Sequence, residues 1–135
     1  MICSTTAPAI DAFVAGVRSH ISVLDPIDAA AMRTSGALFV DTRPVAQRVE
    51  FGGIPDAIVI ERNVLEWRLD PTSHHRHPAV ASHDGELVVF CQEGYASSLA
   101  VETLGDLGVP NVHDLAGGFA AWVAAGLPVE REEFP

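Results

Sequence analysis

The sequence contains no lysine, and all eight of its basic residues are arginine. Without lysine there is no amine side chain for Schiff-base chemistry with carbonyl substrates or pyridoxal phosphate. A Walker A motif is excluded as well, because it needs a lysine at the nucleotide phosphates. Eighteen acidic residues bring the formal net charge to −10, so neither nucleic acid nor an anionic membrane surface is an expected partner.

Cysteines and long apolar runs are also scarce. The two cysteines, Cys3 and Cys91, lie in dissimilar surroundings, and a disulfide framework needs more of them. No apolar run approaches the roughly 20 residues of a membrane-spanning helix. The N-terminal residues lack the basic start and unbroken apolar stretch of a signal peptide. We therefore expect a reduced, cytoplasmic protein without membrane attachment.

A length of 135 residues suits one domain, and 48% apolar residues suffice for a core. Short apolar runs predict strands at 37–40, 57–60, 87–90 and 111–115, with a weaker one at 21–24. Apolar residues at helical spacing predict helices at 9–18, 27–33, 97–107 and 117–125. Because strands and helices alternate, we expect an α/β fold with a parallel sheet covered on both faces.

Residues 70–85 form a polar segment with proline near both ends, which predicts a surface loop. The segment carries His74, His75 and His77, with His83 close by. No cysteine lies near them, and no predicted helix or strand would frame a ligand set. We interpret them as a solvated histidine-rich loop and expect no metal.

Three other residues with functional potential are interpreted as structural. His113 lies within a predicted strand, and Trp67 and Trp122 are expected to anchor the core.

The segment around Cys91 is the strongest candidate for chemistry. A predicted buried strand runs straight into Cys91, a short loop with Gly94 follows, and a helix is predicted from Ser97. Sites in open α/β sheets lie at the carboxyl ends of strands, and the N–H groups of a helix N-terminus stabilise an anion. The sequence thus favours a reactive thiol, with a small buried hydrophobic residue as the alternative.

This loop resembles the active-site loop of the rhodanese family, in which cysteine, two residues, glycine, two more and serine follow in order. Two other parts of the chain are similar to family motifs. One is Leu-Phe-Val-Asp-Thr-Arg at 38–43 with Gly-Ile-Pro-Asp-Ala at 53–57. The other is Leu-Ala-Gly-Gly-Phe-Ala-Ala-Trp at 115–122 with Ala-Gly-Leu-Pro-Val at 125–129. The form Cys-Gln-Glu-Gly-Tyr resembles a single-domain, actinobacterial-type subgroup.

The resemblance implies a rhodanese-like three-layer α/β fold with a central, mostly parallel five-stranded sheet and helices on both faces. Residues 1–20 would be an N-terminal helical extension, and 21–135 a single rhodanese-like domain. The implied activity is a sulfurtransferase that moves sulfane sulfur from thiosulfate or a related small donor to a thiol, a protein thiol or cyanide. Cys91 would be the nucleophile and carry the sulfur as a persulfide, without a cofactor.

The resemblance also assigns supporting residues. The persulfide anion would be bound by the backbone amides of the loop, which consists of Gln92, Glu93, Gly94, Tyr95, Ala96 and Ser97. Asp41 and Arg43 would form either a fixed ion pair beside the site or contacts to substrate. Arg48 is the candidate for binding an anionic donor.

The chain departs from the family pattern at two loop positions. Ala96 stands where many relatives carry arginine, and Glu93 where the residue is often basic. A carboxylate at position 93 would repel an anionic donor. No lysine exists to compensate, so backbone amides and a few arginines must stabilise the anion.

Two other functions are alternatives to sulfur transfer. A cysteine phosphatase needs an arginine at the sixth position after the cysteine, because its fork of donors clamps the phosphoryl oxygens. Ser97 stands there, which disfavours phosphate chemistry. A non-catalytic rhodanese-like binding or regulatory module stays open as the alternative.

Overall fold

The computed structural model describes residues 8–131. They form a five-stranded sheet in the order β1-β5-β4-β2-β3, with every neighbouring pair parallel. The strands are β1 (Val23–Leu24), β2 (Leu38–Asp41), β3 (Ile58–Val59), β4 (Leu87–Phe90) and β5 (Val112–Leu115). The predicted α/β fold with a five-stranded parallel sheet is confirmed.

Four helices match the predicted ones to within about a residue at most ends. They are α1 (Ala9–Arg18), α2 (Pro26–Thr34), α6 (Ala96–Asp106) and α7 (Gly118–Ala124). Asp25 caps α2, since its side chain accepts a hydrogen bond from the Asp28 N–H at 2.8 Å. Shorter segments were not predicted: α3 (Val45–Phe51), η1 (Arg62–Val64), α4 (Leu65–Leu69) and α5 (Pro78–Ala81). The segments η1, α4 and α5 have three to five residues each, which is too short to show a helical period in the sequence.

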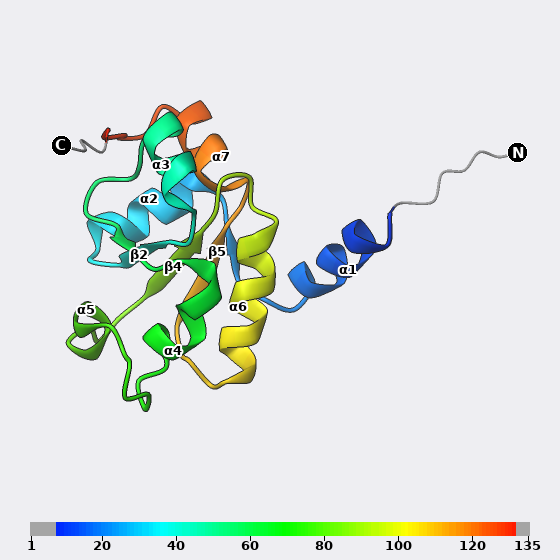
Figure 1. The fold of residues 1–135 in the computed structure, drawn as a ribbon. Helices are drawn as coiled ribbons and strands as arrows, with labels where there is room; N and C mark the ends of the chain where they lie inside the picture. The colour runs from blue at the N-terminus through cyan, green and yellow to red at the C-terminus, as the bar shows by residue number, and fades with distance from the viewer. Residues whose placement is uncertain (1–7, 132–135) are drawn as a thin grey trace, which may run out of the picture.

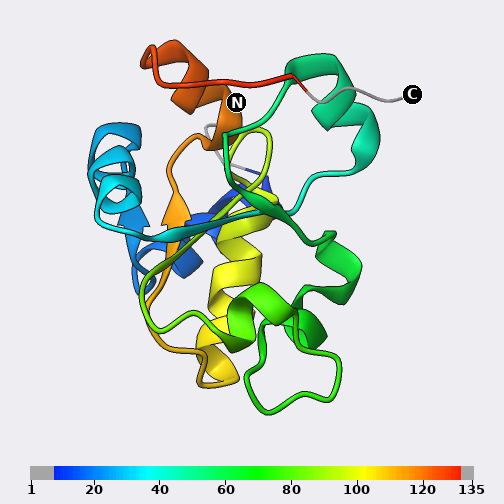
Figure 2. The ribbon, with the colours of Figure 1, turned by 90° about the vertical axis from the view of Figure 1, so that its left-hand side faces the viewer.

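The sheet is the middle of three layers, with α4 and α6 on one side and α2 and α7 on the other (Figures 1 and 2). All four residues of β4 are buried, as expected of a strand covered on both faces. Val89 packs with Leu65 and Leu104 in one core cluster. Phe90 packs with Phe119 in the other, so successive strand residues supply opposite cores.

The N-terminal helix α1 packs through its last turns onto the domain and leads away from it towards the N-terminus (Figure 1). Val14 and Val17 are buried, whereas Ile10 and Phe13 are exposed. The expected helix is thus present, and the division of the chain at residue 20 stays a prediction. Cys3 lies outside the described residues.

Two interpretations of the sequence are wrong. The segment 70–85 is more than a surface loop, because α5 lies within it and buries Val80 in the core. Trp67 is not a core anchor, since it is 59% exposed while Leu65 and Leu69 on the same short helix are fully buried. Trp122 is buried as expected.

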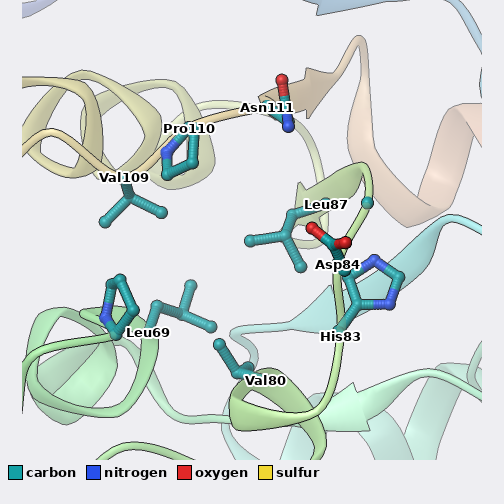
Figure 3. A pocket seen from close by; sticks show the side chains of 10 residues that line it. Leu69, Val80, His83, Asp84, Leu87, Val109, Pro110 and Asn111 are labelled. Carbon is teal, nitrogen blue, oxygen red and sulfur yellow. The ribbon is translucent and has the colours of Figure 1, made fainter.

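A small cavity opens where β4 and β5 begin (Figure 3). Its volume is about 110 Å³, and Leu69, Val80, Leu87 and Val109 give it an apolar lining. Figure 3 also shows His83 at its rim. Cys91 follows the opposite end of β4, so the cavity and the predicted nucleophile lie at different edges of the sheet.

Among the residues that the structure describes, none of the helices combines the length and apolar character needed to cross a membrane.

Candidate active site

Cys91 lies directly after β4, at the carboxyl edge of the sheet, and is 8% exposed. The chain then turns through a short loop into α6, which begins at Ala96. The loop points the first amides of the helix back toward the sulfur. The Gly94 N–H lies 3.1 Å from Sγ, and the Ser97 N–H lies 3.4 Å from it. A thiolate or a persulfide here would meet two N–H donors and the positive end of an eleven-residue helix.

The loop rests on a pair of glycines at the start of α7. A Cβ at Gly94, which has φ +88°, would lie 2.8 Å from the Gly117 nitrogen. A Cβ at Gly118 would lie 2.5 Å from the Cys91 carbonyl oxygen. The Phe119 N–H donates to that carbonyl at 2.9 Å. The Gly-Gly pair seen in the sequence therefore allows two backbones to meet and fixes the position of Cys91.

Asp41 and Arg43 form a buried ion pair beside the loop, as one of the two interpretations predicted. Arg43 donates to both carboxylate oxygens of Asp41, at 2.9 and 2.7 Å. Its guanidinium also donates to Gln92 Oε1 at 2.8 Å and to the Gly52 carbonyl at 2.7 Å. The guanidinium carbon lies 4.3 Å from the ring centroid of Phe119. Arg43 thus ties the loop to the end of β2.

Arg48 is buried behind this ion pair. Its Nη1 donates to the Arg43 carbonyl at 2.7 Å, which links α3 to the end of β2. Its predicted contact with an anionic donor stays a prediction. Of the loop residues, Glu93, Tyr95 and Ala96 are exposed, and Ser97 is buried.

Three residues absent from the predicted site complete the geometry: Arg18, Ser98 and Asp114. The Ser97 hydroxyl donates to Asp114 Oδ1 at 2.6 Å, and the Ser98 hydroxyl lies 2.6 Å from Oδ2. Asp114 is fully buried. Burial raises the pKa of its carboxyl above the ordinary value, and hydrogen bonds from Ser97 and Ser98 and the charge of Arg18 oppose that rise.

Arg18 reaches the loop from the last turn of α1. Its Nη2 donates to the Gly94 carbonyl at 2.6 Å, and its Nε donates to the Ser98 hydroxyl oxygen at 3.0 Å. The guanidinium carbon also lies 5.5 Å from the ring centroid of Tyr95. A groove of about 270 Å³ runs beside the loop, with Arg18 and Glu93 both in its lining.

A buried aspartate inside a predicted strand was the signal that could have indicated Asp114, because an unpaired carboxylate is costly there. Nothing in the sequence links Arg18 to a loop 76 residues away.

Two of the four histidines in the segment 70–85 are held by local contacts. His77 Nδ1 accepts from the Ala79 N–H and caps α5, and the His83 ring bonds to the Glu86 carbonyl. His74 and His75 are exposed. Within residues 8–131, no group of three or more His, Cys, Asp or Glu side chains is placed to hold a metal ion.

Residues 25–125 match the model of the Rhodanese-like domain family. The chain belongs to this family. The rhodanese-like domain is 30% identical over 100 residues to a sulfurtransferase of Allochromatium vinosum. The alignment covers 74% of this chain and 84% of that protein. The domain is 27% identical over 99 residues to a thiosulfate sulfurtransferase of Actinobacillus succinogenes. That alignment covers 73% of this chain and 80% of the relative.

A solved structure resembles the rhodanese-like domain along nearly its whole length. This protein of unknown function from Rhodopseudomonas palustris is described as a possible tyrosine phosphatase. The similarity has a TM-score of 0.81 at 33% identity and covers 96% of this chain and all of the other.

Proposed function

We propose that the protein is a rhodanese-type sulfurtransferase that carries sulfane sulfur as a persulfide on Cys91. The observation that supports this most is the pair of amides, from Gly94 and Ser97, that donate to Sγ at the start of α6. Backbone donors fixed in advance stabilise an anion without reorganisation during the reaction. The sulfurtransferase relatives add support for this class of chemistry.

The proposed reaction has two steps. The Cys91 thiolate attacks the outer sulfur of thiosulfate, the S–S bond of the donor breaks, and sulfite leaves with the bonding pair. The outer sulfur of the resulting persulfide then passes to an acceptor thiolate or to cyanide, and the Cys91 thiolate returns as the leaving group. Because the enzyme alternates between two covalent states, ping-pong kinetics are expected.

The surroundings of Cys91 favour a small donor. The side chain is only 8% exposed, so a compact donor such as thiosulfate or a polysulfide fits better than a bulky one. An acceptor can be a small thiol or a protein thiol on a partner with a basic face, since the chain carries a net charge of −10. A cytoplasmic location and the actinobacterial-type subgroup belong to the same proposal, and they rest on the sequence alone.

Mass spectrometry tests the proposal directly. Incubation of the reduced protein with thiosulfate should add the mass of one sulfur, about 32 Da, to the peptide that contains Cys91. The Cys91→Ser variant should take up no sulfur, while Cys3→Ser should load like the parent. If no adduct forms with thiosulfate, polysulfide or mercaptopyruvate, the non-catalytic binding module becomes the better hypothesis.

The solved structure described as a possible tyrosine phosphatase makes phosphatase activity worth measuring in the same protein. Ser97 stands at the sixth position after Cys91, where phosphate chemistry needs arginine, and its N–H donates to Sγ. We expect no phosphatase activity that depends on Cys91. Hydrolysis of an aryl phosphate that Cys91→Ser abolishes would replace the sulfurtransferase proposal.

A further inference from the structure

A continuous chain of hydrogen bonds runs from the sulfur of Cys91 to a buried carboxylate. Cys91 Sγ donates to Ser97 Oγ at 3.2 Å, and the Ser97 hydroxyl donates to Asp114 Oδ1 at 2.6 Å. The three groups come from the end of β4, the first turn of α6 and the middle of β5. The thiol and the hydroxyl thus each lie within hydrogen-bond distance of the next acceptor in the chain.

We propose that Ser97 and Asp114 form a proton relay that ionises Cys91, with Asp114 as the proton acceptor that acts through the Ser97 hydroxyl. The proton of Cys91 passes to Ser97 Oγ while the proton of Ser97 passes to Asp114 Oδ1. The result is a thiolate, an unchanged serine and a neutral carboxylic acid, so the total charge stays the same. This inference rests on the proposed function, because it describes how that nucleophile is made.

The surroundings of Asp114 suit a proton acceptor. Its carboxylate is fully buried, so neutralisation removes the cost of a charge in a medium of low dielectric constant. The same burial raises the pKa of Asp114, which brings the carboxyl closer to the range in which it can hold a proton. After the transfer, the Gly94 and Ser97 amides face the new thiolate.

Other charged groups around the relay are held by partners of their own. Arg18 of α1 bonds to Ser98 and the Gly94 carbonyl, and Arg43, just after β2, is paired with Asp41. Glu93 and Tyr95 of the loop are exposed. On β5, the His113 ring bonds to the Ser22 hydroxyl. On the second turn of α6, Glu102 pairs with His20, which follows α1.

The relay predicts a distinctive pH dependence. While Asp114 can take the proton, a fixed share of the protein holds an internal thiolate whatever the pH of the solution. The rate of a thiolate reaction then levels off on the acid side. Without the relay, the thiolate forms only by loss of a proton to solvent, and the rate falls about tenfold for each unit of pH.

The test is the rate of alkylation of Cys91 by iodoacetamide, measured from about pH 5 to pH 9 in a Cys3→Ser background. Ser97→Ala removes the bridging hydroxyl and keeps the backbone N–H, and Asp114→Asn removes the acceptor and keeps the shape. Thr103→Ala is the matched control, because Thr103 lies on the same helix and its hydroxyl donates to the Leu99 carbonyl, outside the relay.

The alkylation rates of the parent and of Thr103→Ala should level off below neutral pH. The alkylation rates of Ser97→Ala and Asp114→Asn should keep falling as the pH is lowered. When each rate is divided by its own alkaline plateau, both variants should lie at least about tenfold below the parent at the acid end. Thermal unfolding confirms that each variant is folded. A steadily falling parent profile, or equal profiles for Ser97→Ala and Thr103→Ala in folded protein, would overturn the relay.

Alkylation needs no sulfur donor, so this result is separate from the sulfur-loading test. A level acid profile without any persulfide would keep the relay and reject the sulfurtransferase. Sulfur loading on Cys91 together with a steadily falling alkylation profile would keep the sulfurtransferase and reject the relay.

Discussion

The guanidinium of Arg18 donates a hydrogen bond to the carbonyl oxygen of Gly94 at 2.6 Å and so joins the N-terminal helix to the Cys91 loop. The same guanidinium donates to the Ser98 hydroxyl oxygen at 3.0 Å. A cation thus reaches the loop from another part of the chain, whereas residues 92–97 of the loop themselves contain no basic residue. The helix α1 is therefore part of the site and not only an extension before it.

Arg18→Ala should loosen the loop. We expect faster hydrogen exchange at the Gly94 and Ser97 amides. The free energy of unfolding should fall by about 1 kcal/mol. This is less than for fully buried charge-assisted hydrogen bonds, because Arg18 is partly exposed. Arg33→Ala is the control, since Arg33 donates to the Pro55 carbonyl far from the sulfur. Equal exchange at the loop amides in both variants would contradict a role of α1 at the site.

Asp41→Asn should destabilise the protein strongly. Both partners of the Asp41–Arg43 pair are almost fully buried, and removal of the carboxylate leaves the guanidinium charge uncompensated. The expected loss is about 3 kcal/mol, read from denaturant unfolding. Glu66→Gln breaks the more exposed pair with Arg62 and should cost less than about 1 kcal/mol. Similar losses in the two variants would show that burial of the first pair has little energetic effect.

Gly94→Ala should disable the loop. A Cβ there would collide with the Gly117 backbone, and φ of +88° is strained for any residue with a side chain. We expect sulfur loading of Cys91 to fall by at least about tenfold, because the amides no longer converge on Sγ. In the matched control Gly105→Ala, on α6, the added methyl group meets nothing within 4 Å. That substitution should stabilise the helix by about 0.5–1 kcal/mol and leave loading unchanged. Full loading of Gly94→Ala would refute the need for this close approach.

Glu93→Gln should speed the attack of Cys91 on thiosulfate. Glu93 is exposed in the loop, so its charge repels an anionic donor through solvent. We expect a rise of about twofold to fivefold in the second-order rate at low ionic strength, shrinking as salt is added. Asp84→Asn removes an exposed charge that precedes the opposite end of β4 and should have no such effect. A rate that is the same in all variants at every salt concentration would rule out the repulsion.

The unfolding free energy should depend on the protonation of Asp114. Burial raises the pKa of this carboxyl in the folded protein, so the folded state holds the proton at pH values where the unfolded chain has lost it. The stabilising contribution is present below the unfolded pKa and is lost as pH rises through the folded pKa. Denaturant unfolding of the parent relative to Asp114→Asn should show this loss, at no more than about 1.4 kcal/mol per pH unit. A difference that is constant above about pH 4 would speak against the raised pKa.

Much of the fold follows from local patterns. The strand at 87–90 was predicted at its observed bounds because both its faces are covered, which makes every residue apolar. The helix at 9–18 was also predicted at its observed bounds, from apolar residues at helical spacing. Trp67 could not be placed correctly, because a helix of five residues shows no period that tells the buried face from the exposed one.

The position of the thiol follows from residues that are neighbours along the chain. A buried strand, Cys91, a glycine-containing loop and the start of a helix come in order, so local geometry brings the amides to the sulfur. What lies behind that loop depends instead on how distant parts of the chain pack together. Asp114 reaches Ser97 because β5 pairs with β4, and Arg18 reaches Gly94 because α1 packs on the domain through Val14 and Val17. Such contacts depend on strand order and helix packing, which no local pattern of residues encodes.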